Sequence, residues 1–146
     1  MYTAGNIIYF DPFFFKNGSL PKPKYFLVLS TLDQHTILAS LPSSKNHLPS
    51  DLPIVHGCIN MPESCISCYI FQKQFPITEK EWAFPETTFL YGNWIDEFPL
   101  AILKETYKVE GLEYELIGTM KTDEFLKVKE CFKNSATVKR KFKRIL

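Results

Sequence analysis

Short apolar runs separated by polar turn residues dominate the first half of the chain. Residues 7–10 and 26–29 are rich in β-branched and aromatic side chains, and Asn17-Gly18 between them is typical of a turn. Three further runs of this kind follow at residues 36–41, at 54–57 with a bend at Gly57, and at 68–71. Because these five predicted strands are joined by loops and not by helices, they favour an antiparallel barrel or sandwich over a parallel sheet.

The pattern is looser between residues 79 and 112, where prolines, tryptophans and acidic residues interrupt the apolar positions. One short helix is predicted there, near residues 99–104. The alternation at residues 113–118 then predicts a strand that returns to the barrel.

A helix is predicted after this returning strand. Thr122 has the character of an N-cap, and Asp123 and Glu124 follow it in what would be the first turn. An apolar stripe then recurs at helical spacing and should pack on the barrel; it consists of Phe125, Val128 and Phe132. Asn134-Ser135 marks a break before a basic terminal segment.

Length and composition indicate one domain spanning residues 1–146. The chain has 146 residues, of which 45% are hydrophobic, enough to build a single core. It has no apolar run near the roughly 18 residues that a membrane span requires, and no basic segment precedes an apolar stretch at the N-terminus. We therefore expect a cytoplasmic protein without a membrane partner, whose four cysteines are thiols or metal ligands and not disulfides.

The small net charge of +1 conceals an asymmetry along the chain. Residues 1–120 carry eight basic and 13 acidic side chains, whereas residues 121–146 carry nine basic and three acidic ones. Five cations lie within six residues at Lys139, Arg140, Lys141, Lys143 and Arg144. Such a cluster either attracts a polyanion or an acidic protein segment, or is simply the solvated end of a helix.

The N-terminal segment resembles the MazF/PemK family of bacterial toxins. The resemblance lies in Gly5-x-Ile7, in Asp11-Pro12, in the Gly18-Ser19 loop and in the Leu27-Val-Leu-Ser30 run, in that order. It covers residues 5–78 and 113–134, so residues 79–112 are expected to be an insertion. It implies a small SH3-like antiparallel barrel with a C-terminal helix, a mainly β fold.

The family also implies an activity and partners. Its members are homodimeric toxins of toxin–antitoxin systems that cleave single-stranded RNA, and an antitoxin peptide binds the same groove. Toxin–antitoxin complexes of this type also bind DNA. The implied cleavage is independent of metals and cofactors, because the ribose 2′-hydroxyl attacks the adjacent phosphate.

The resemblance assigns candidate catalytic residues to this chain. Lys24 stands where the family has an Arg just before the second strand, and it retains the charge but not the planar fork that binds phosphate. Ser40 matches the Ser or Thr at the end of the next strand, with Ser43 and Ser44 as alternatives. His47 in the following loop is a further candidate from its own chemistry, as an acid or base.

A set of RNA-binding residues is expected around these three. The aromatic run at residues 13–15 and Tyr25 offer rings on which unpaired bases stack, although a strand turns part of such a run into the core. The predicted RNA-binding residues are Phe14, Lys22, Tyr25, Ser43 and Lys45.

The cysteines offer a competing interpretation. His56, Cys58, Cys65 and Cys68 supply four ligands of the kind that Zn²⁺ prefers, with one Cys-x2-Cys spacing. Buried thiols explain the same residues, because free cysteine is often part of a core.

Two functions remain open from the sequence. One is an endoribonuclease toxin; the other is a non-catalytic module of the same fold whose groove binds a peptide partner or nucleic acid. Fold analogy does not separate them, because the chain departs from the family at the site itself.

Overall fold

The computed structural model describes residues 1–146 and is mainly β, as predicted. Its strands are β1 (Asn6–Phe13), β2 (Lys22–Thr31), β3 (Thr36–Ser40), β4 (Gly57–Met61), β5 (Ile66–Phe71), β6 (Thr88–Tyr91), β7 (Asp96–Pro99) and β8 (Tyr114–Thr119). Its helices are α1 (Leu100–Thr106), α2 (Thr122–Lys133) and α3 (Arg140–Lys143), with short 3-10 turns η1 (Pro62–Ser64) and η2 (Gly92–Trp94).

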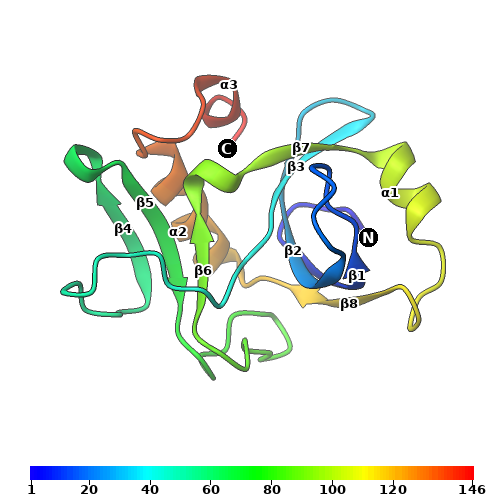
Figure 1. Ribbon diagram of the computed structural model, residues 1–146, viewed down its shortest axis with the longest axis horizontal. Helices are drawn as coiled ribbons and strands as arrows, with labels where there is room; N and C mark the ends of the chain where they lie inside the picture. Colours follow the sequence, from blue (N-terminus) through cyan, green and yellow to red (C-terminus); the bar gives the residue numbers. More distant parts are fainter.

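The strands form two open antiparallel sheets. Five strands pair in the order β7-β3-β2-β1-β8, and three pair in the order β4-β5-β6. Single bridges join the margins of the two sheets, from Ser43 to Phe89 and from Thr78 to Met120. Figure 1 shows the sheets standing side by side, with α2 lying against the smaller one.

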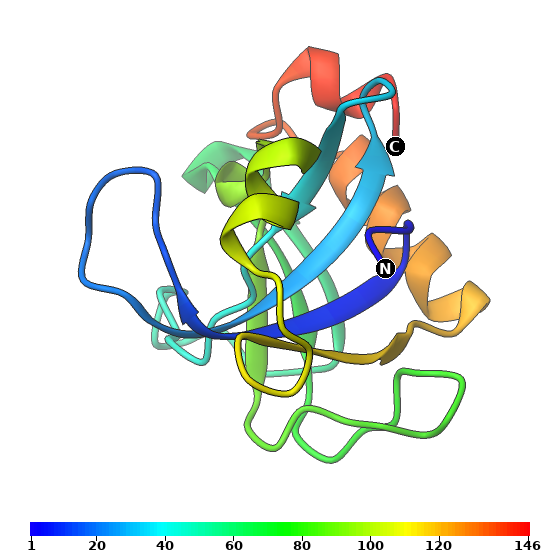
Figure 2. The ribbon, with the colours of Figure 1, turned by 90° about the vertical axis from the view of Figure 1, so that its right-hand side faces the viewer.

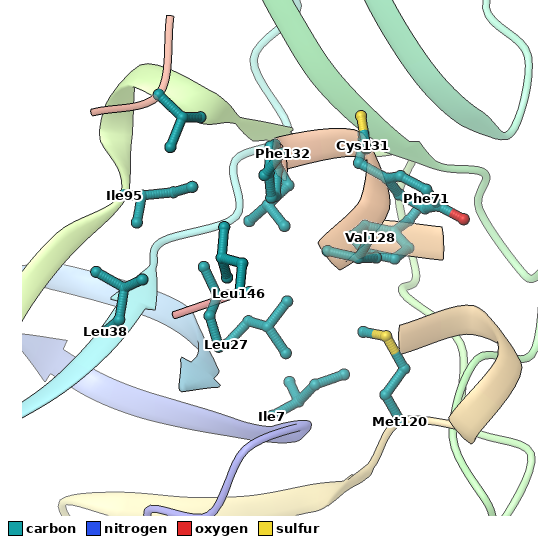
Figure 3. Packing of buried hydrophobic residues seen from close by; sticks show 14 of the residues in the cluster. Ile7, Leu27, Leu38, Phe71, Ile95, Met120, Val128, Cys131, Phe132 and Leu146 are labelled. Carbon is teal, nitrogen blue, oxygen red and sulfur yellow. The ribbon is translucent and has the colours of Figure 1, made fainter. Parts of the chain in front are cut away.

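The main core lies between the two sheets and is closed by α2 and the C-terminal segment. It includes Ile7 and Leu27 from the larger sheet, Phe71 from the smaller one, and Val128 and Phe132 from α2 (Figure 3). The predicted apolar stripe of α2 therefore packs as expected, with Phe125 partly buried beside it.

The larger sheet is buried on both faces, which explains why its sequence is so continuously apolar. Ile7 and Leu27 face the main core, whereas their neighbours Ile8 and Phe26 face a second cluster. This alternation follows from the period of two along a strand. Helix α1 supplies Leu103 to the second cluster and covers that face of the sheet (Figure 2).

Most of the predicted elements are confirmed, including the strands near 7–10, 26–29, 36–41, 68–71 and 113–118 and the helix near 99–104. Two boundaries were wrong. Residues 54–56 do not belong to a strand: β4 begins only at Gly57, whose φ of +125° bends the chain as it enters the strand. Thr122 is the first residue of α2 and Lys121 is its N-cap, so the Thr122 side chain does not cap the helix.

Residues 79–112, expected to be an insertion, contribute to both sheets. β6 pairs with β5 in the smaller sheet, and β7 pairs with β3 at the margin of the larger one. Helix α1 also comes from this stretch. None of the helices of the protein has the length and apolar character that crossing a membrane requires.

Candidate nucleic-acid groove

The start of β2 carries two lysines on the same side of the strand. Lys22 and Lys24 are separated by Pro23, and side chains two positions apart point to the same side. Lys24 pairs with Phe10 of β1 and Lys22 pairs with Phe13 across an irregular part of the β1–β2 ladder. The loop that joins β1 to β2 projects from the body of the protein beside these lysines (Figure 2).

The loop after β3 carries a third lysine and is held in place by hydrogen bonds. Ser43 exchanges two backbone hydrogen bonds with Phe89 of β6, at 3.0 and 2.7 Å. The Tyr91 hydroxyl donates to the Lys45 carbonyl at 2.6 Å and accepts from the His47 backbone N–H at 2.8 Å. Strand β6 therefore fixes the positions from which Lys45 and His47 project.

Together these segments form one groove with two hollows, which we call the lysine groove. Lys22, Lys24, Ser43 and Lys45 line both hollows and therefore form the wall between them. The polar hollow, of about 330 Å³, is completed by Tyr9, Pro23, Tyr25, Pro42, Ser44, Pro85, Glu86 and Thr88. The aromatic hollow, of about 880 Å³, is completed by Phe15, Asn17, Ser19, Leu20, Leu41, His47 and Trp94.

Lys24 is the most perturbed cation of the groove. Its side chain is half-buried, and its ammonium group donates to the Pro42 carbonyl at 3.3 Å. Burial lowers the pKa of Lys24 to about 8, and repulsion from Lys22 and Lys45 adds to the shift. None of these three lysines belongs to an ion pair. Since a bound anion would relieve this repulsion, the groove is suited to a phosphate or a carboxylate.

Ser43 is placed to donate to such an anion. Its Oγ accepts the Lys45 backbone N–H at 3.1 Å. The hydroxyl proton is then free to point toward the wall that Ser43 shares with the three lysines.

Aromatic rings flank the wall on both sides. In the aromatic hollow, Trp94 is 43% exposed and contacts the His47 ring edge to face, with the ring centroids 5.7 Å apart. Phe15 lies below the Lys22 ammonium group, at 5.9 Å. In the polar hollow, the rings of Tyr9 and Tyr25 lie 5.0 Å apart. Rings that are at least partly exposed, as these are, offer surfaces on which bases stack.

The structure brings most of the predicted site residues together. Lys24, His47, Lys22, Tyr25, Ser43 and Lys45 all line the lysine groove. Sequence reasoning missed Tyr9, Glu86 and Trp94. Phe15 belongs to an aromatic run that pointed to the region, whereas nothing in the sequence linked Glu86 or Trp94 to the lysines.

Two predicted site residues lie outside the lysine groove, and for Ser40 burial contradicts the prediction. Ser40 is fully buried, its Oγ has no hydrogen-bond partner, and it pairs with Leu27 inside the larger sheet, so it does not reach the groove. Ser43, the alternative, takes its place. Phe14 is 53% exposed but lies outside the groove, where its ring stacks on Tyr107.

The predicted zinc ligands do not converge. Cys58 forms a disulfide with Cys131, with the two Cα atoms 5.6 Å apart, so the expectation of four thiols or metal ligands was wrong for this pair. Cys65 is exposed and Cys68 is buried in a separate apolar cluster. His56 bonds Glu124 instead, with Nε2 2.5 Å from Oε1. No group of three or more His, Cys, Asp or Glu side chains is arranged to hold a metal ion.

The basic terminal segment is anchored by its apolar residues. Val138, Phe142 and Leu146 are buried in the main core, and Lys141 pairs with Glu97 of β7 at 2.6 Å. The segment thus closes the core while it presents its other cations at the surface.

Comparisons of the chain with models of known protein families, with curated proteins and with solved structures found no match in any of the three.

Proposed function

We propose that the protein binds single-stranded RNA in the lysine groove and cleaves it without a metal, as a diverged MazF/PemK-like endoribonuclease. The observation that supports this most strongly is the composition of one groove: three lysines outside any ion pair, a serine hydroxyl, a histidine and partly or fully exposed rings on both sides. Lysines bind the phosphates of a nucleic acid, and aromatic rings bind its unpaired bases.

The proposed chemistry is an attack of the ribose 2′-hydroxyl on the adjacent phosphorus. The new bond is 2′-O to phosphorus and the broken bond is phosphorus to 5′-O, so the products end in a 2′,3′-cyclic phosphate and a 5′-hydroxyl. His47 is the candidate proton carrier, accepting the 2′-hydroxyl proton or protonating the 5′-oxygen. Lys24 and Lys45 neutralise the charge that builds on the phosphate, and Ser43 donates to a non-bridging oxygen.

An RNA substrate places the proposed activity in the cytoplasm, where reductants keep most thiols reduced. The Cys58–Cys131 disulfide lies on the β4–α2 side of the protein, and neither cysteine lines the lysine groove. RNA binding is therefore expected to persist when this disulfide is reduced.

The test is cleavage of a mixed-sequence single-stranded RNA by the purified protein in the presence of EDTA. Wild type should release fragments with cyclic phosphate ends, and Lys24→Ala, Ser43→Ala and His47→Ala should each cut at least about 100-fold more slowly. Lys104→Ala, which removes an exposed lysine of α1, is the matched control and should cut like wild type.

A substrate with 2′-deoxyribose throughout should bind but remain intact. Cleavage of that substrate, or equal cleavage by wild type and the three groove variants, would contradict the proposed chemistry. Binding of RNA with no cleavage by wild type would instead support a non-catalytic module that uses the same groove.

A further inference from the structure

The two hollows of the lysine groove have different chemistry, although they share one wall. The wall is cationic, through Lys22, Lys24 and Lys45. The aromatic hollow offers mostly rings and aliphatic groups, whereas the polar hollow contains a carboxylate, from Glu86. A chain that lays a phosphate on the wall would place one neighbouring base in each hollow.

The Glu86 carboxylate is free, even though it lines the same hollow as three lysines. The Glu86 side chain is exposed, takes part in none of the ion pairs of the protein and accepts no hydrogen bond from another side chain. Only its backbone carbonyl is engaged, by the Thr88 hydroxyl at 2.8 Å. A carboxylate whose role was to neutralise the three lysines would form an ion pair with one of them, and Glu86 forms none.

The position of Glu86 is fixed by the strand that follows it. Pro85 precedes it and restricts the backbone, and β6 begins two residues later at Thr88, which is buried. The hydrogen bond from Thr88 closes this short turn. The Glu86 backbone is therefore fixed beside the polar hollow, which Tyr9 and Tyr25 also line.

An ionised carboxylate only accepts hydrogen bonds, so it distinguishes bases by the donors on their edges. Guanine offers N1–H and an exocyclic amino group side by side, and adenine and cytosine each offer an exocyclic amino group. Uracil has no exocyclic amino group, and two carbonyl oxygens flank its only N–H. A carboxylate at this position therefore favours amino-bearing bases and disfavours uracil.

We propose that Glu86 is the specificity-determining residue of the lysine groove, an inference that rests on the proposed function. It selects a base with an exocyclic amino group beside the bound phosphate, and it favours guanine most strongly. The base in the polar hollow lies against Tyr9 and Tyr25 while its amino group donates to Glu86. The base on the other side of the phosphate stacks in the aromatic hollow, against Trp94.

The experiment measures equilibrium binding of fluorescent 2′-O-methyl oligonucleotides, which lack the attacking hydroxyl and stay intact. One oligonucleotide contains only uridine, and three others carry a single guanosine, adenosine or cytidine in its centre. Wild type should bind the guanosine oligonucleotide about tenfold more tightly than the all-uridine one, the discrimination of one good bidentate contact. The adenosine and cytidine oligonucleotides should fall between these two.

Glu86→Gln should reduce this preference to within about twofold, because the carboxamide carries both a donor and an acceptor. Loss of a negative charge beside the lysines also tightens binding of every oligonucleotide, but the ratio between two oligonucleotides is not affected by that change. Glu79→Gln, which neutralises an exposed carboxylate outside the groove, is the matched control and should keep the wild-type preference.

The possible failures are distinct. Equal binding of the all-uridine and guanosine oligonucleotides by wild type, or an unchanged preference in Glu86→Gln, overturns the role of Glu86 and leaves RNA binding intact. Absence of binding to every oligonucleotide overturns the proposed function, and the specificity with it.

Discussion

The lowered pKa of Lys24 predicts that RNA binding weakens at mildly alkaline pH. With a pKa of about 8, Lys24 is about nine-tenths charged at pH 7 and about one-tenth charged at pH 9. A phosphate on the wall favours the charged form, so the complex keeps the proton that the free protein has lost. Binding at pH 9 must therefore include protonation of Lys24, and the dissociation constant should rise about tenfold between pH 7 and pH 9.

The assay is fluorescence anisotropy with an oligomer of 2′-O-methyladenosine, whose bases do not titrate in this range. Lys24→Arg is the informative variant, because the guanidinium stays charged throughout the range. It should bind nearly equally at pH 7 and pH 9. Lys24→Ala should bind weakly and without this pH dependence, and Lys104→Arg, outside the groove, should behave like wild type.

The titration of Lys24 does not itself weaken the fold at alkaline pH. Because the pKa of Lys24 is lower in the folded protein than its ordinary value of 10.5, the unfolded chain binds more protons between these two values. Titration of Lys24 therefore stabilises the fold as pH rises through this range. Equal affinity of wild type at pH 7 and pH 9, with Lys24→Arg showing the same profile, would refute the assignment of Lys24 to the phosphate.

Three further predictions concern the stability of the fold. Glu124 accepts hydrogen bonds from His56 and Tyr69. Glu124→Ala should lower the free energy of unfolding in urea by roughly 3 kcal/mol, because it leaves the buried Tyr69 hydroxyl and the partly buried His56 ring without their partner; a loss below about 1 kcal/mol would contradict this. These hydrogen bonds lower the pKa of Glu124 against the opposing effect of burial, so the contribution should be complete above its ordinary value of 4.5 and disappear as pH falls below it, as acid titrations of wild type and variant will show. Phe132→Ala in the main core should cost about 3–5 kcal/mol in the same assay, and a cost near zero would mean that α2 does not pack as described. Cys58→Ser should lower stability by about 2–4 kcal/mol and abolish the effect of dithiothreitol on the melting temperature, while RNA binding stays unchanged.

The sequence predicted the strands that have a β-favouring run or a clear alternation of their own. β1 and β2 could be recognised because a short turn at Asn17-Gly18 joins two β-favouring runs, and α2 because its apolar stripe repeats at helical spacing. β6 and β7 could not be recognised in the same way. Each has four residues, and each is stabilised as a strand by a partner from a distant part of the chain, β5 for one and β3 for the other.

The residues of the candidate site also divide into those that the sequence predicts and those that it does not. Lys22 and Lys24 could be assigned because they adjoin a recognisable strand, and Ser43 because it follows the next one. Glu86 and Trp94 reach the same groove only because β6 pairs with the loop that carries Ser43, a contact across more than 40 residues that spacing does not reveal. The disulfide between Cys58 and Cys131 escaped prediction for the same reason, because 73 residues separate its cysteines and only the packing of α2 on β4 joins them.

The most direct test of the account is the affinity of a ten-nucleotide single-stranded RNA for a triple variant in which Lys22, Lys24 and Lys45 are all alanine. The matched control replaces the exposed or partly exposed lysines Lys104, Lys129 and Lys133 and changes the net charge by the same amount. The account predicts that the groove variant loses at least about 100-fold in affinity and that its slope of log affinity against log salt falls by about 2, while the control stays close to wild type. Equal losses in the two triple variants would show that net charge, and not the lysine groove, binds the RNA.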